Sequence, residues 1–171
     1  MTSLTNTDDL KVLMYDKIYS RFFSKIEAYD FLELPEENLY SFLTEWLHSV
    51  IANPHVRKLF ETFIIYDEVQ EIKYKMKYTV DEFSDEEFLI EILSIGLIIS
   101  WLEPRVNSIN NVAQVFGSKE EKFYSQSQHL HELRALVKDS RIKQRRLIAD
   151  RGYAWNPYLD GDIKINKDDT L

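Results

Sequence analysis

The chain has 171 residues, of which 44% are hydrophobic, with four glycines, four prolines and no cysteine. This length predicts one domain with a substantial core, and the missing cysteines exclude disulfide scaffolds, thiolate metal sites and cysteine nucleophiles. So few glycines leave no glycine-rich loop to hold a phosphate, and no stretch has the ~20 apolar residues of a membrane helix. We therefore expect a soluble intracellular or particle-associated protein, with no membrane partner.

Apolar residues at helical spacing dominate the first third of the chain. The pattern predicts one helix from about Asp8 to Ile26, a second from Pro35 to Asn53 and a third over residues 55–66. Each of these segments has one apolar face and one polar face. Three such helices in succession predict a mainly helical bundle.

The period changes between Ile72 and Val80, where apolar residues alternate with lysine and threonine. Strict alternation is typical of a half-exposed β-strand. A lone strand cannot satisfy its own backbone groups, and no second stretch alternates as well. Two interpretations of residues 72–80 therefore stay open. The segment is either the tail of a continuous helix, or an edge strand or hairpin arm that pairs with another subunit.

The most hydrophobic segment runs from Phe88 to Leu102 and is apolar almost all round, which predicts a helix at the centre of the core. Residues 84–87 fit a capping box that opens this helix, and Pro104 is expected to end it. Gly96 would let another helix approach closely. Glu91 and Glu103 lie near the two ends of this segment, and burial would raise the pKa of either one, although such a carboxylate is more typical of packing than of catalysis.

A second capping box at residues 118–121 opens the longest helical pattern, which runs to Arg151 and meets a natural stop at Gly152. A helix of this length would measure ~50 Å at 1.5 Å per residue. A domain of this size cannot cover it, so we expect part of the helix to project or to pack against another chain.

The final segment, residues 152–171, has no helical pattern and contains closely spaced aromatic residues. This composition is typical of an extended arm that becomes ordered by docking, and the alternative is that it folds back onto its own domain. The chain is thus divided into a helical domain over residues 1–151 and a C-terminal arm over residues 152–171. The candidate arm anchors are Tyr153, Trp155, Pro157 and Tyr158.

Charge is distributed unevenly along the chain. Residues 1–133 hold 12 Lys and Arg against 23 Asp and Glu, a net charge of −11, whereas residues 134–151 carry a net charge of +5. The positive surplus exceeds what the helix dipole explains, and it favours head-to-tail contact between copies or contact with an acidic partner. The candidate contact residues include Arg141, Arg145 and Arg146.

The same basic stretch would suit phosphate contacts, so a DNA-binding or regulatory protein is an alternative. The acidic body and the lack of a recognisable helix-turn-helix count against it.

Metal and nucleophile motifs are weak in this sequence. His129 and His131 lie two residues apart on a helix and cannot chelate one ion, and no serine lies in a G-x-S-x-G turn. Asp160-Gly-Asp162 lacks the remaining ligands of a calcium loop. We expect no catalytic residue, no metal and no cofactor, so the protein is not expected to be an enzyme.

In residues 91–153, a hydrophobic helix, a W-x-x-P break and a Phe-Tyr-Ser-Gln turn lead into a long charged helix. In this pattern the chain resembles small virion proteins of tailed bacteriophages, over roughly a third of its length. Its architecture is also similar to head-to-tail adaptor (connector) proteins of those phages. The residues that carry the resemblance are Trp101, Pro104, Asn107, Phe116, Lys119, Phe123, Tyr124, Ser125, Gln126, His129, Leu130 and Leu133.

The resemblance implies a structural virion protein, assembled in the host bacterial cytoplasm into a ring of about twelve copies on the portal. The ring would also contact the next neck or tail protein and prolong a channel through which DNA passes without sequence recognition. The arm anchors would dock on the portal or on a neighbouring copy, with residues 134–151 at the ring or portal interface. A tail-completion protein or an assembly chaperone is the further alternative.

Overall fold

The computed structural model describes residues 10–26, 36–115 and 120–154. Within these ranges the chain forms five helices and a small antiparallel sheet of three strands, which confirms a mainly helical fold with a long helix near the C-terminus. The expected arm lies outside the described residues, apart from residues 152–154. The elements in chain order are β1 (Lys11–Met14), α1 (Tyr15–Phe23), α2 (Glu36–Ala52), α3 (Pro54–Arg57), β2 (Phe60–Tyr66), β3 (Glu71–Met76), α4 (Glu82–Val115) and α5 (Glu120–Ala154).

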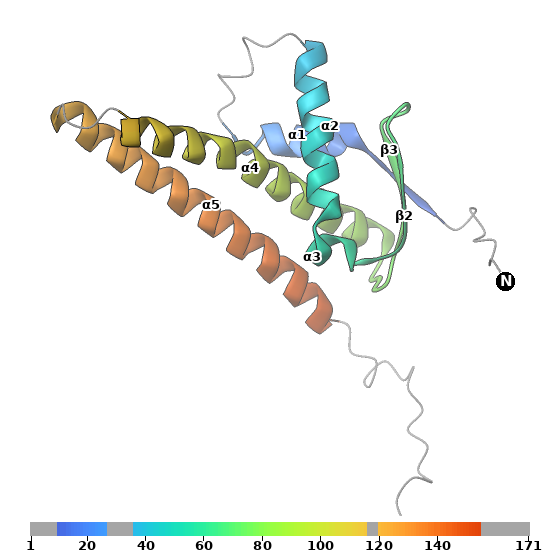
Figure 1. Cartoon of the computed structure of the whole chain (residues 1–171). Helices are drawn as coiled ribbons and strands as arrows, with labels where there is room; N and C mark the ends of the chain where they lie inside the picture. Colours follow the sequence, from blue (N-terminus) through green and yellow to red (C-terminus); the bar gives the residue numbers. More distant parts are fainter. Residues whose placement is uncertain (1–9, 27–35, 116–119, 155–171) are drawn as a thin grey trace, which may run out of the picture.

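The sheet lies at one end of the molecule, and the far ends of the two long helices lie at the other (Figure 1). The first half of α4 lies against the sheet, α1 and α2, and α5 returns antiparallel alongside α4. The far ends of α4 and α5 extend beyond the rest of the domain as a helical hairpin. The expectation that part of the long helix projects from the domain is therefore confirmed.

The alternating segment does form a strand, but its expected pairing is wrong. Strand β3 lies at the centre of the sheet, between β1 and β2, and both neighbours come from the same chain. Its inward residues Ile72, Tyr74 and Met76 are buried, whereas Lys75 points outward. The strand therefore needs no second subunit to satisfy its backbone groups.

The expected first helix is partly wrong, because residues 11–14 form strand β1 and the helix begins only at Tyr15. Leu13 and Tyr15 are both buried, so the apolar residues at the start of this segment fit a strand as well as a helix. Pairing with β3 decides between the two, since it satisfies the backbone of both strands.

The expected third helix is also wrong beyond its first turn. Helix α3 ends at Arg57, and the aromatic and β-branched residues from Phe60 to Tyr66 form strand β2. A four-residue turn without glycine joins β2 to β3, and Gln70 has a φ of 54° there. Because glycine usually marks such a turn, no local residue pattern predicts this hairpin.

Helix α4 contains the expected apolar segment, and its buried residues form the centre of the core. The helix begins earlier than expected: Asp81 accepts a hydrogen bond from the backbone N–H of Ser84 (2.8 Å), so Asp81 rather than Ser84 is the cap. Pro104 lies inside α4 and does not end it. The proline removes one backbone donor, but α5 packs along α4 and supports the helix on both sides of that residue.

Gly96 has the expected packing role at the crossing of α2 and α4. A methyl group in its place would lie 2.8 Å from Cγ2 of Val50, closer still to Cγ1, and 3.1 Å from Nε2 of Gln144. Gly152, by contrast, does not stop α5, which continues to Ala154. A methyl group there would meet no atom within 4 Å. Ser118, the expected cap of α5, lies outside the described residues.

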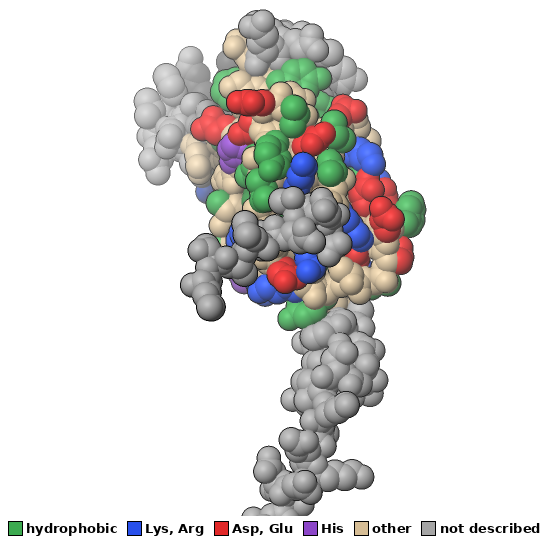
Figure 2. Space-filling model, turned by 90° about the vertical axis from the view of Figure 1, so that its right-hand side faces the viewer, with side chains coloured by type: hydrophobic (Ala, Val, Ile, Leu, Met, Phe, Trp, Pro, Cys, Tyr) green, Lys and Arg blue, Asp and Glu red, His purple; other side chains and the backbone are tan. Residues whose placement is uncertain are grey.

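The outer face of the sheet mixes charged and apolar side chains. Val12, Met14 and Tyr66 are exposed there, Lys75 pairs with Glu61 at 3.2 Å, and Lys73 lies 5.1 Å from the centre of the Tyr66 ring. Figure 2 looks onto this side of the molecule and shows hydrophobic side chains interspersed with both signs of charge.

The two glycines give a matched test of the packing. Gly96→Ala should lower the free energy of unfolding by about 1–3 kcal/mol, because the added methyl overpacks the crossing with Val50. Gly152→Ala should raise it by about 0.5–1 kcal/mol, because alanine loses less backbone entropy in an open helical position. Denaturant unfolding of both variants measures these changes. A neutral Gly96→Ala variant would contradict the close approach, and Val50→Ala should offset part of its cost.

Candidate functional site

The sequence directs attention to the basic half of α5. Arg141, Arg145 and Arg146 all lie on this helix with exposed side chains. Tyr153 lies in its last turn, and Trp155, Pro157 and Tyr158 lie outside the described residues. The structure therefore brings the three arginines onto one element, but it does not test the arm anchors.

Much of the positive charge on α5 is matched by carboxylates on α4. Arg141 pairs with Glu103, and Lys143 pairs with Glu91 at 3.0 Å. Near the end of the helix, Arg151 pairs with Asp85. The surplus that appeared in the sequence as a binding feature thus serves in part to hold the two long helices together.

Asp85 is fully buried and receives donors from separate parts of the chain. Lys11 of β1 lies 3.1 Å from one carboxylate oxygen, and the backbone N–H of Val80 donates to the other at 3.0 Å. Arg151 donates to that second oxygen, and its guanidinium lies 5.1 Å from the centre of the Phe88 ring. Because a buried charge is tolerated only when it is paired, this carboxylate joins β1, α4 and α5.

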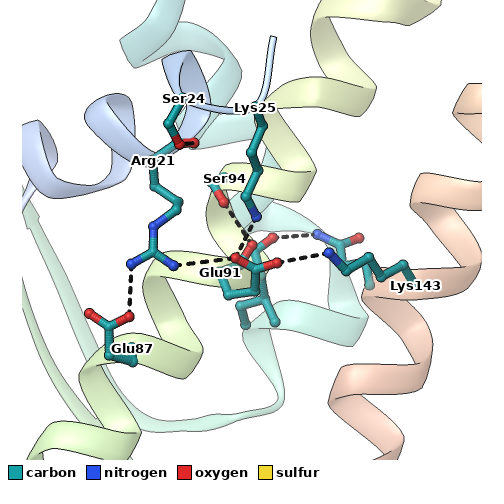
Figure 3. Close-up of polar contacts among 9 residues, drawn as sticks. Arg21, Ser24, Lys25, Glu87, Glu91, Ser94 and Lys143 are labelled. Atoms are coloured by element: carbon teal, nitrogen blue, oxygen red, sulfur yellow. Dashed lines mark hydrogen bonds and ion pairs between the residues drawn. The ribbon is translucent and has the colours of Figure 1, made fainter.

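Glu91 forms a second junction, between α1, α4 and α5, which Figure 3 shows. Its carboxylate pairs with Lys25, with Arg21 at 3.5 Å and with Lys143 at 3.0 Å. Arg21 also bonds Glu87 at 2.8 Å. Next to this junction, the buried amide of Gln144 donates to the carbonyl of Ile92 at 2.8 Å and adds a further link between α4 and α5.

The titration of Glu91 differs from the expectation. Burial acts to raise the pKa of its carboxyl, but the hydrogen bonds from Lys25 and Lys143 outweigh it and hold that pKa below the usual 4.5. Burial also lowers the pKa of Lys25, in spite of its bond to Glu91, and Lys143 and Arg21 add repulsion. Glu91 therefore stays ionised and serves as an anchor, and the expected rise in its pKa is wrong.

One side of the helical hairpin is hollowed, and we call this hollow the α4–α5 groove. It has a volume of about 500 Å³, and Val137 and Ile142 form apolar parts of its wall. Glu103 is the acidic residue among those that line it. Its basic lining residues are Arg134, Lys138, Arg141 and Arg145.

The groove continues towards α2 and α3 as a more polar hollow of about 430 Å³. Glu103, Arg141 and Arg145 line both hollows. Within the described residues, Arg145 makes no hydrogen bond or ion pair, whereas Arg146 pairs with Asp150 on the exposed side of α5 at 3.8 Å. Arg145 is therefore the cation best placed to meet an incoming anionic group.

Sequence reasoning missed a polar cluster at the other side of α2. Tyr15 donates to Asp67 at 2.7 Å, and Nε2 of His48 lies 2.9 Å from the same carboxylate oxygen. Burial raises the pKa of Tyr15, and the hydroxyl of Tyr19 lies 3.2 Å from that of Thr44. These residues come from three distant segments, so no local motif could reveal them.

This cluster connects the β2–β3 turn to α2. The turn supplies Asp67, whose desolvation acts to raise its pKa, while the bonds from Tyr15 and His48 more than compensate and lower it. Both donors bind one oxygen atom, so the geometry serves to fix the turn against the helix. In the described ranges, no group of three or more His, Asp or Glu side chains is arranged to hold a metal ion.

Comparison with known proteins finds no matching family model, no similar curated protein and no similar solved structure. Among the helices of the described ranges, none combines the length and apolar character needed to cross a lipid bilayer.

The Glu91 junction predicts a defined pH dependence of stability. Because its folded pKa lies below 4.5, the carboxylate contributes fully above that pH, and the contribution is lost as the pH falls through the lowered folded value. Glu91→Gln should lower the free energy of unfolding by about 1–2 kcal/mol at neutral pH, since it leaves Lys25 and Lys143 without their shared anion. The difference in free energy of unfolding between the variant and the wild type should become smaller in acid.

Denaturant unfolding at several pH values measures this difference. Glu68→Gln is the matched control, because Glu68 is exposed in the β2–β3 turn and should change stability by less than about 0.5 kcal/mol at any pH. If the loss of free energy of unfolding in Glu91→Gln stayed constant down to pH 3, the ionised carboxylate of Glu91 would not be the group that stabilises the fold.

Proposed function

We propose that this protein is a non-enzymatic structural component of a tailed-phage virion. In this proposal it forms an oligomeric ring at the head-to-tail junction, docks on the portal and prolongs the DNA channel. The observation that carries the proposal is the projecting α4–α5 hairpin, with its partly unmatched basic groove, on a body whose sequence is strongly acidic.

The projecting hairpin supports assembly because a helix pair that extends beyond its domain leaves side chains for another molecule to cover. Leu136 and Ile142 of α5 are about half exposed, at 48% and 53%. Apolar side chains beside charged ones are typical of the core and rim of a protein interface. The opposite charges of the groove and the body favour contact between the groove of one copy and an acidic part of another.

DNA binding through α5 is the second candidate, and the four cations of the α4–α5 groove favour it. Against it, Arg141, Lys143 and Arg151 are already paired with carboxylates of α4. Charge reversal at Arg145 and Arg146 would abolish a salt-dependent mobility shift if this candidate were right. No shift of a DNA fragment at low salt would dismiss it.

Copy number in purified particles tests the proposed function first. Quantitative mass spectrometry, normalised to the portal subunit, should give about one copy per portal subunit if the rings match in symmetry. Absence from finished particles would contradict a virion role and favour an assembly chaperone or a DNA-binding protein.

Deletion of residues 155–171 tests whether this segment serves assembly. Helix α5 extends to Ala154 and Arg151 is held in the core, so the deletion should begin after Ala154. The shortened protein should keep its helical circular dichroism and its melting temperature but lose the ability to assemble on the portal. Loss of the fold would contradict this, since the segment would then belong to the core.

A further inference from the structure

We propose that the polar hollow between α2, α4 and α5 binds a small phosphate ester that carries hydroxyl groups, such as a sugar phosphate. The hollow has a volume of about 430 Å³, which lies within the ~300–1,000 Å³ of typical ligand pockets. This inference goes beyond the proposed virion role and does not depend on it, because neither ring formation nor docking on a portal needs such a ligand.

An almost buried amide with an unused acceptor indicates a ligand in the hollow. Gln144 lines the hollow and is only 8% exposed. Its Nε2 donates to the carbonyl of Ile92 at 2.8 Å, which fixes the side chain. Its Oε1 has no hydrogen-bond partner among the residues that the structure describes, yet it is not fully enclosed, so a molecule in the hollow can reach it. Because an unmet acceptor in such a site costs free energy, a hydroxyl donor from the ligand would stabilise it.

Other polar side chains of the hollow offer donors that the chain itself leaves unused. Ser49, Ser100 and Arg145 line the hollow, and within the described ranges none of them makes a hydrogen bond or an ion pair. The side-chain oxygen of Asn53 accepts from the backbone N–H of His55 at 3.0 Å, so the amide N–H groups of Asn53 stay available. A phosphate group has strong acceptor oxygens, and a set of free donors around a guanidinium therefore suits it.

Charge places the phosphate on the α5 side of the hollow. In the described part of the chain Arg145 has no carboxylate partner, whereas Glu103 pairs with Arg141. The end of α2 forms another side, where the last carbonyl oxygens carry the negative end of the helix dipole and no basic residue lies in the last turn. Those carbonyls repel a phosphate but accept hydrogen bonds from hydroxyl groups. A hydroxylated phosphate ester therefore matches both sides.

The floor of the hollow favours a small ligand over DNA. Gly96 lies there, and a methyl group in its place would lie 3.1 Å from Nε2 of Gln144. Val50 and Ile99 form the apolar part of the lining, which suits the C–H groups of a sugar ring. The phosphodiesters inside a DNA strand have no hydroxyl group to donate to Gln144, and a duplex is too wide to enter a hollow of this volume.

Isothermal titration calorimetry of the full-length protein tests the inference, with ribose 5-phosphate, ribose and inorganic phosphate as probes. Ribose 5-phosphate should bind at least about tenfold more tightly than either of the other two, because it alone presents both a phosphate group and sugar hydroxyls. A short DNA duplex without terminal phosphates serves as the competitor, and it should not displace ribose 5-phosphate.

Variants at the hollow locate the binding. Arg145→Gln should weaken the binding of ribose 5-phosphate by about tenfold or more, and Ser100→Ala should weaken it by about threefold or more. Arg146→Gln is the matched control and should stay within about twofold of the wild type, because Arg146 lies on the same helix but pairs with Asp150 outside the hollow. All three variants should keep the wild-type melting temperature, since none of these side chains is buried.

Four results would overturn the inference. The first is no binding of ribose 5-phosphate at about 10 mM, and the second is equal affinity for ribose 5-phosphate and inorganic phosphate, which would mean that the hydroxyls are not recognised. The third is an equal loss of affinity in Arg145→Gln and Arg146→Gln, as a general basic surface would give. The fourth is displacement by the DNA duplex, which would assign these residues to a DNA-binding surface.

Discussion

The buried carboxylate of Asp85 is the constraint on which the rest of the structure depends. A fully buried negative charge is costly unless donors surround it, and here the donors come from β1, from Val80 just before α4 and from the end of α5. Lys11 and Arg151 therefore cannot be placed elsewhere without leaving Asp85 unpaired. This single requirement holds the first strand and the last helix of the described chain at the same end of α4.

Given that anchor, the remaining packing is organised along α4. Glu91 lies less than two turns further along the helix and joins α1 and α5, and Gly96 then admits α2 at close range. Two polar junctions and then a close crossing thus follow one another along one helix. Beyond Pro104, α4 is accompanied mainly by α5, so the two form a hairpin that leaves the body (Figure 1).

The same arrangement determines which charges are left for other molecules. Cations of α5 that face the carboxylates of α4 are neutralised within the chain, as Lys143 and Arg151 show. The groove keeps a positive surplus because Glu103 alone among its lining residues is acidic. An interaction surface therefore results from the spacing of acidic residues on α4, which is dense near Asp85 and sparse towards the far end of the hairpin. The proposed contacts between copies use this positive surplus of the α4–α5 groove.

The sequence by itself determined the parts that depend on local pattern. The apolar run of α4, the length of α5, the alternation around Tyr74 and the packing role of Gly96 all follow from periodicity or residue size. Only the tertiary structure decided whether residues 11–14 and 60–66 are strands, because their apolar residues suit both periods and pairing with β3 selects one. It also decided that Pro104 and Gly152 lie within helices, and that Glu91 and Arg151 are anchors. Each of these outcomes depends on partners distant in the chain, whose pairing and burial energies outweigh local preference.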